Sequence, residues 1–265
     1  KPLVFWKWLI DEVQKDHPEA IFFAEAFTRP KVMKFLAKAG FTQSYTYFTW
    51  RNAKWELRQY LEELTQTDMK DYYRGNLFAN TPDILHEFLQ KGGRPAFMIR
   101  FILAATLSSS YGIYNSFELC EAVAKEPGSE EYLDSEKYQY KVWDWDRPGN
   151  IKDLISKVNR IRSENPALQE YKNLEFYDSK NDSVLCYGKR TADNSNRIVV
   201  VVNLDPFRVH EDLITLPLRK LGIKEGETFR AKDLLTGATY DWQGPSQYVR
   251  LDPQVMPAHI FLIKK

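Results

Sequence analysis

The stretch Ala-Ile-Phe-Phe-Ala-Glu-Ala-Phe, residues 20–27, is the most informative feature of the sequence because it places one carboxylate, Glu25, near the end of an apolar run. An apolar run of this length between polar segments is typical of a strand covered on both faces, as in a parallel sheet. In (β/α) barrels, the active site lies at the carboxyl ends of such strands. Glu25 is therefore a candidate catalytic acid, and the alternative is a structural ion pair with a neighbour such as Arg29.

Helices and strands alternate on both sides of this stretch. The expected elements are a helix over 3–15, the strand that ends at Glu25, a helix over 30–38, a strand over 43–48, a helix over 51–64, a strand over 75–80, helices over 83–89 and 95–107, and a strand over 111–114. This alternation with short links predicts an α/β fold with a parallel sheet. Four strands are half of a closed barrel, and a doubly wound open sheet is the alternative, although no glycine-rich phosphate turn follows the first strand.

The character of the sequence changes in its last third. A long polar loop over 120–149 is followed by an expected helix over 150–165. Short alternating runs then follow, separated by Gly, Pro, Asn and Asp turns, over 174–177, 184–189, 197–203, 228–233, 238–242, 247–251 and 258–263. This pattern predicts an antiparallel β-sandwich, and we expect it to buttress the first domain because it contains no cluster of acids or histidines.

Composition excludes several classes of protein. With 37 Lys and Arg against 36 Asp and Glu, the net charge of +1 favours neither nucleic acid nor an anionic membrane. No apolar run approaches the roughly 18 residues of a membrane span, and no signal peptide is expected. Two cysteines, Cys120 and Cys186, fit a reducing compartment, so we expect a cytoplasmic protein. Four scattered histidines lack ligand spacing, so neither a metal nor a cofactor is expected.

Two of the expected strands end in carboxylates, Glu25 after the first and Asp83 beyond the third. In a barrel these ends converge on one mouth. Paired acids there suggest glycosidic-bond chemistry, in which one acid holds a proton for the leaving oxygen and the other stays ionised against positive charge on the sugar. Exposed aromatic residues would also suit a non-catalytic carbohydrate-binding module, which remains an alternative.

These motifs carry a family resemblance. Phe23-Ala24-Glu25-Ala26-Phe27 and Asn80-Thr81-Pro82-Asp83 resemble the acid and third-carboxylate motifs of the α-amylase superfamily, glycoside hydrolase family 13. Most amylases carry Asn-His-Asp where this chain has Thr81-Pro82-Asp83. In that detail, in segment 108–118 and in loop 128–138, the chain is similar to one branch, the α-1,4-glucan:maltose-1-phosphate maltosyltransferases.

The resemblance implies a fold and an activity. Residues 1–168 would form the C-terminal half of a (β/α)8 TIM barrel and residues 169–265 the β-sandwich. The activity would be retaining transfer of maltosyl units from α-maltose 1-phosphate to the non-reducing end of α-1,4-glucans, by an enzyme that forms a homodimer. Glu25 matches the general acid/base, Asp83 the transition-state stabiliser, and Lys137 and Tyr138 the residues expected to hold the donor's distal glucose.

One expected part is missing. The family's nucleophile lies in a Gly-x-Arg-x-Asp pattern on the strand before the opening helix, and this pattern does not occur in the chain. We therefore expect residues 1–265 alone to be inactive, and to associate or aggregate because four strands leave two open edges. An amylase-type hydrolase or transglycosidase acting on unphosphorylated glucan is a further alternative.

Overall fold

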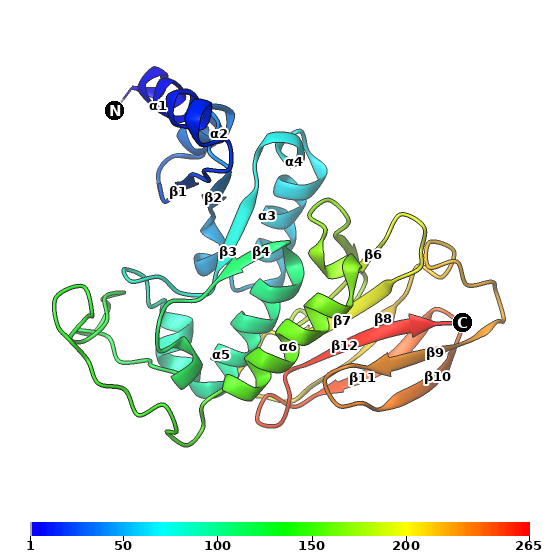
Figure 1. The fold of residues 1–265 in the computed structure, drawn as a ribbon. Coiled ribbons are helices and arrows are strands. Elements are labelled where there is room, and N and C mark those ends of the chain that lie inside the picture. The colour runs from blue at the N-terminus through cyan, green and yellow to red at the C-terminus, as the bar shows by residue number, and fades with distance from the viewer. Residues whose placement is uncertain (1) are drawn as a thin grey trace.

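Four short parallel strands form the first sheet of the computed structural model, which describes residues 2–265 (Figure 1). They are β1 (Phe23–Ala24), β2 (Gln43–Tyr45), β3 (Gly75–Phe78) and β4 (Ser110–Gly112), in the order β1-β2-β3-β4. Each strand pairs in parallel with the next, for example Ala24 with Ser44 and Asn76 with Ser110. Because helices connect consecutive strands, the carboxyl ends of all four lie at the same edge.

The helices agree with the expected order. They are α1 (Leu3–Asp16), α2 (Pro30–Lys38), α3 (Lys54–Gln66), α4 (Met69–Tyr72), α5 (Glu87–Leu107) and α6 (Lys152–Glu164), with 3-10 turns η1 (Tyr47–Trp50), η2 (Phe117–Leu119) and η3 (Pro166–Gln169). Pro30 occupies the first turn of α2, where its missing N–H costs no hydrogen bond. Gly40 follows that helix with φ of 111°, a conformation that favours glycine.

Two predicted elements were wrong in detail. The helix expected over 83–89 begins only at Glu87 and continues as α5, which is kinked at Gly93 (φ 58°) just before Pro95. The strand expected over 43–48 ends at Tyr45. There Thr46 Oγ1 accepts a hydrogen bond from the Phe48 amide and starts η1.

The burial predicted for residues 20–27 was also wrong. Ile21 is 63% exposed and Phe23 46% exposed, although Ala24 is buried. The reason is that β1 is an edge strand with β2 as its one partner among the described residues. Figure 1 shows α1, α2 and β1 projecting from the rest of the molecule, so little protein covers this end of the sheet.

Residues beyond η3 form two antiparallel sheets. The larger has the order β10-β9-β12-β7-β6-β5 and the smaller pairs β11 with β8. The strands are β5 (Glu175–Tyr177), β6 (Val184–Arg190), β7 (Arg197–Asn203), β8 (His210–Thr215), β9 (Thr228–Asp233), β10 (Thr239–Gln243), β11 (Ser246–Leu251) and β12 (Ala258–Lys264). The sheets share a buried apolar cluster that includes Val199, Ile214 and Leu251, which fits the predicted sandwich.

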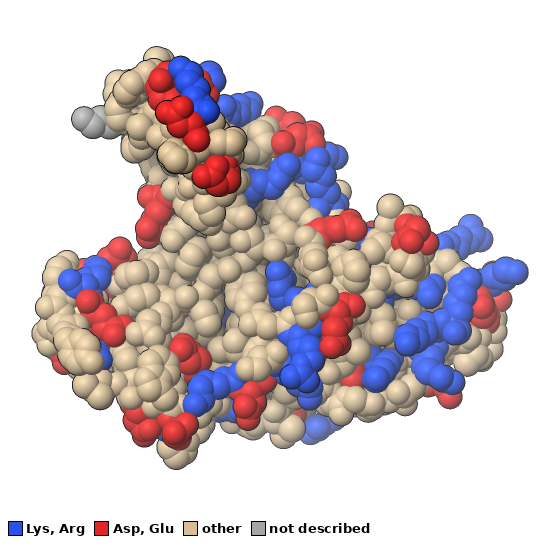
Figure 2. All heavy atoms as spheres, viewed as in Figure 1, with Lys and Arg blue, Asp and Glu red and all other residues tan. Residues whose placement is uncertain are grey.

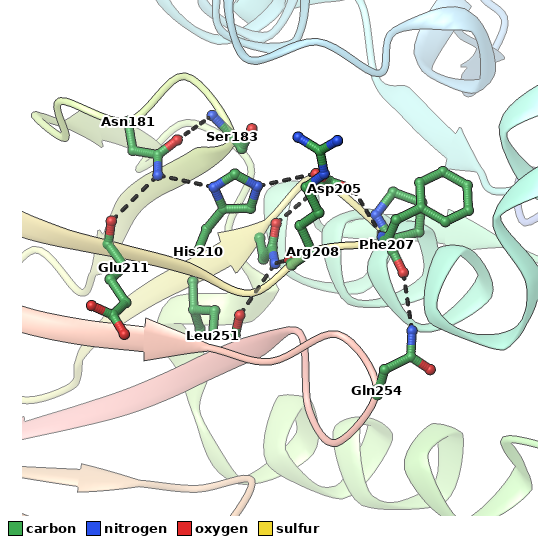
Figure 3. Close-up of polar contacts among 11 residues, drawn as sticks. Asn181, Ser183, Asp205, Phe207, Arg208, His210, Glu211, Leu251 and Gln254 are labelled. Atoms are coloured by element: carbon green, nitrogen blue, oxygen red, sulfur yellow. Dashed lines mark hydrogen bonds and ion pairs between the residues drawn. The ribbon is translucent and has the colours of Figure 1, made fainter.

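Strand β8 was not predicted, and polar contacts hold its first residue. His210 Nε2 lies 3.1 Å from Asp205 Oδ2, and its Nδ1 lies 3.1 Å from Asn181 Nδ2 (Figure 3). The Ser183 amide donates to Asn181 Oδ1, so the Asn181 amino group must face the imidazole. His210 Nδ1 is therefore the acceptor, and Nε2 donates to Asp205. These contacts tie the loop before β6 to the start of β8.

The main apolar core runs from the parallel sheet's helices into the large antiparallel sheet. Leu103, Val158, Leu185 and Val200 all belong to one buried cluster. Lys54 Nζ at the start of α3 donates to Ser179 O and Oγ and to Asn181 O, at 2.8 to 3.0 Å. The sandwich therefore supports α3, α5 and α6, the elements that back the parallel sheet.

Candidate active site

Glu25 lies immediately after β1, at the carboxyl edge of the parallel sheet. Partial burial, and then the negative charge of Asp83, raise the pKa of Glu25 above its ordinary value. Glu25 also lies near Tyr45 of β2. Burial, and then the charge of Glu25, raise the pKa of Tyr45. Glu25 and Asp83 therefore share one electrostatic environment although 58 positions separate them in the sequence.

A cluster of aromatic side chains lies beside Glu25. The Phe27 ring meets those of Tyr45 and Trp50 edge-on, with centroids 5.8 and 5.1 Å away. Tyr45 stacks on Phe78 at 4.3 Å. Phe78 in turn lies over Gly112, where an added Cβ would come within 2.3 Å of the ring, so only glycine fits. Flat aromatic faces next to an acid suit the apolar faces of sugar rings.

A hydrogen-bonded turn presents Asp83. Thr81 and Ile84 exchange both backbone hydrogen bonds, and the Asp83 amide donates to Thr81 Oγ1 at 3.2 Å. Before this turn, the fully buried Asn80 accepts from the Tyr114 amide at 2.8 Å and donates to the Tyr132 hydroxyl at 2.6 Å. Asn80 thus joins the end of β3, the segment after β4 and the long loop 120–149.

Lys137 reaches Asp83 from that loop. Its Nζ forms an ion pair with Asp83 Oδ1 and lies 3.7 Å from Glu131 Oε1. The Tyr138 side chain points outward and is 78% exposed, with its ring centroid 5.4 Å from Lys137 Nζ. The structure thus brings Glu25, Asp83 and Lys137 together, whereas Tyr138 lies at the rim.

Several contacts that shape this site were not predicted from the sequence. Trp50 Nε1 donates to both carboxylate oxygens of Glu130, at 2.9 and 3.1 Å, which fixes the indole against Phe27. Arg100, fully buried in α5, holds η1 by donating to Phe48 O and Arg51 O at 2.6 and 2.7 Å. No local pattern reveals these contacts, because each partner is about 50 or more positions away in the sequence.

The raised pKa of Glu25 leads to a prediction. An acid with a raised pKa stays protonated to higher pH, so Glu25 keeps its proton where an ordinary glutamate has lost it. Asp83→Asn removes the second cause of the rise but not the burial. We expect the Glu25 pKa, measured by NMR titration of its side-chain carbon, to fall in Asp83→Asn while remaining above the usual value. An unchanged titration curve would contradict the proposed coupling of the two acids.

Charged side chains of both signs lie on the face of the molecule drawn in Figure 2. Figure 2 shows acidic and basic side chains interspersed over the visible face, with Lys and Arg most frequent over the antiparallel strands. Across residues 2–265, no three His, Cys, Asp or Glu side chains gather in a way that could hold a metal ion. In the same described part of the chain, no helix has the length and apolar character needed to cross a membrane.

Comparison with known proteins supplies the family. A family model described as "GLGE, C-terminal" matches residues 176–263. The chain is 57% identical over 263 residues to an alpha-1,4-glucan:maltose-1-phosphate maltosyltransferase of Rhodospirillum rubrum, covering 99% of this chain and 38% of that protein. It is 50% identical to one from Pseudomonas aeruginosa, covering 100% of this chain and 40% of that protein.

The chain corresponds to the C-terminal portion of this maltosyltransferase family. The resemblance drawn from residues 23–27 and 80–83 is thereby confirmed. The chain spans about 40% of the length of these curated relatives.

Solved structures agree on the fold. The chain superposes on an Anoxybacillus alpha-amylase with a TM-score of 0.72 at 13% identity, covering 99% of this chain and 56% of the amylase. Superposition on an alpha-amylase from H. orenii gives a TM-score of 0.69 at 13% identity, covering 99% of this chain and 57% of that amylase. At this identity the likeness concerns the fold alone, and it shows that the chain shares the fold of the matched parts of these alpha-amylases.

Proposed function

We propose that the full-length protein containing this chain transfers maltosyl units from α-maltose 1-phosphate to the non-reducing end of α-1,4-glucans, with release of phosphate. One observation carries the proposal. Glu25, Asp83 and Lys137, which matched the family's motifs, meet at the carboxyl edge of the parallel sheet. The names of the relatives support the donor and the acceptor.

The proposed chemistry needs a nucleophile from the upstream part of the protein. Its carboxylate attacks the anomeric carbon of the donor while the bond from that carbon to the phosphate oxygen breaks. Glu25 gives its proton to the departing phosphate. In the second step the acceptor's 4-hydroxyl attacks the same carbon, the bond from that carbon to the nucleophile's carboxylate oxygen breaks, and Glu25 takes the hydroxyl proton. The nucleophile is then again a free carboxylate and Glu25 again carries its proton. A raised pKa suits Glu25 for the first step.

Asp83 and loop 120–149 supply the other groups that the proposed reaction needs. We infer that the Asp83 carboxylate stabilises positive charge on the sugar ring in both transition states. Lys137, now paired with Asp83, and the exposed Tyr138 would contact the donor's distal glucose. We further propose that residues 1–168 form half of a (β/α)8 barrel closed by upstream strands, and that residues 169–265 form the buttressing sandwich. A cytoplasmic homodimer remains a prediction.

The proposal is tested by a two-arm assay on purified full-length protein. Maltose 1-phosphate plus maltohexaose should release phosphate, whereas maltohexaose alone should yield no new reducing ends. New reducing ends without any requirement for the phosphorylated donor would favour the amylase-type hydrolase. Tight glucan binding with neither activity would favour a non-catalytic module. Residues 1–265 alone should show no turnover in either arm.

A further inference from the structure

We propose that Glu136 is a positioning residue that fastens the donor-binding turn of loop 120–149 to the segment after β4. This inference rests on the proposed function, because the turn is the one that carries Lys137 and Tyr138. Glu136 precedes Lys137 directly, yet its side chain faces a different set of partners. Those partners come from two separate parts of the chain.

The Glu136 carboxylate receives three side-chain donors. Trp143 Nε1 donates to Oε1 at 3.1 Å, and Asn115 Nδ2 and the Tyr114 hydroxyl donate to Oε2 at 2.6 and 3.3 Å. These hydrogen bonds lower the pKa of Glu136 despite its partial burial, so the group is held as a carboxylate. Hydrogen bonds to a charged group are each stronger than neutral ones. One side chain thus joins residues 114 and 115 to both ends of a turn in the loop.

The turn itself directs Glu136 and Lys137 to different partners. Ser135 Oγ accepts from the Lys137 amide, and Ser135 O accepts from the amides of Tyr138 and Gln139 at 2.9 and 3.1 Å. Lys137 meets Asp83 and Glu131, while Glu136 meets Tyr114, Asn115 and Trp143. Holding the Glu136 side chain in place therefore also sets the position of the Lys137 backbone relative to Asp83.

Backbone conformation at both ends of this contact supports a held geometry. Ser116, next to Asn115, has φ of 68°, and Asp134, two residues before Glu136, has φ of 50°. Left-handed conformations at residues other than glycine persist where surrounding contacts determine them. Lys141 adds to those contacts, because its Nζ donates to Leu133 O at 2.7 Å and lies 4.9 Å from the centroid of the Trp143 ring.

The chemistry of the contact makes Glu136→Gln informative. Both carboxylate oxygens receive N–H donors, so the new amide must place its own NH2 against either the Trp143 or the Asn115 donor. In the full-length enzyme we expect KM for maltose 1-phosphate to rise about tenfold, with kcat within about twofold of wild type. Hydrogen exchange of residues 133–143 should become faster. The control is Glu126→Gln, at an exposed glutamate of the same loop. It should change neither KM for maltose 1-phosphate nor the hydrogen exchange of residues 133–143.

A double variant tests the contact between Glu136 and Asn115 directly. Combining Glu136→Gln with Asn115→Asp restores a donor and acceptor pair, and should recover most of the KM and of the exchange protection. Exchange and KM at wild-type values in Glu136→Gln would overturn the inference, and so would a fall in kcat with KM unchanged. If the wild-type protein releases no phosphate, the proposed function fails, and the exchange rates still decide whether Glu136 fastens the loop.

Discussion

Glu25→Gln in the full-length protein is expected to lower kcat for phosphate release from maltose 1-phosphate by about 10³-fold. Proton transfer by a positioned acid is worth roughly 10²- to 10⁴-fold, and Glu25 must act as acid in one step and as base in the other. The amide keeps the size of the side chain but can do neither. Steady-state phosphate release at saturating maltohexaose measures the effect.

Two controls separate lost chemistry from a damaged fold. Glu19→Gln changes an exposed glutamate paired only with exposed His17 in this structure, and should leave kcat within about twofold. The thermal midpoint of Glu25→Gln should equal or exceed that of the wild type, because an ionised carboxyl with a raised pKa is less favourable in the folded state. Residual activity above about a tenth of wild type would refute the role given to Glu25.

The largest effect on stability is expected at Arg100. Its guanidinium is fully buried, bonds to two carbonyl oxygens and lies 3.8 Å from the Phe48 ring centroid. Only 2% of the Arg100 side chain is exposed, and this burial lowers its pKa to about 9. Arg100→Ala removes the side-chain donor of both carbonyls, of which Phe48 O keeps the Arg51 amide, and opens a cavity, so we expect a loss of about 3–5 kcal/mol in the free energy of unfolding.

Thermal unfolding of the full-length protein followed by calorimetry measures this loss. The transition that contains these residues should move down by about 6 °C or more, since each kcal/mol is worth roughly 2–4 °C in a unit of this size. Arg160→Ala, at an exposed position of α6, should move it by less than about 2 °C. Equal shifts for the two variants would mean that the buried guanidinium contributes no special stability.

The succession of elements could be predicted from the sequence because it depends on local pattern. Apolar spacing at the helical period identified α1, α3 and α6, and β-branched runs identified β6 and β7. The register and burial of β1 could not be predicted in the same way. An apolar octapeptide looks the same whether a partner covers it or not, and among the described residues β1 has β2 alone. Strand β8 was missed because it opens with the polar run His210, Glu211 and Asp212, and because the next two residues are both apolar although Leu213 is 52% exposed.

The acids of the candidate site could be chosen because they follow strands. Parallel strands bring their carboxyl ends together, so the sequence alone predicts Glu25 and Asp83 at one edge. The groups that hold them were not foreseen. Trp50 pairs with Glu130 and Asn80 with Tyr132, and each contact joins residues that are far apart in the sequence. Such pairs follow from side-chain packing in three dimensions, which periodicity does not report.

We propose that this chain supplies the acid and the stabilising carboxylate for maltosyl transfer. The most direct test is mass spectrometry of maltohexaose after incubation with full-length protein and maltose 1-phosphate, together with the phosphate released. We expect products longer by two glucose units per step, one phosphate for each step, and no ladder of products with Glu25→Gln. Shortened products, single-glucose steps, or an unchanged ladder with Glu25→Gln would contradict it.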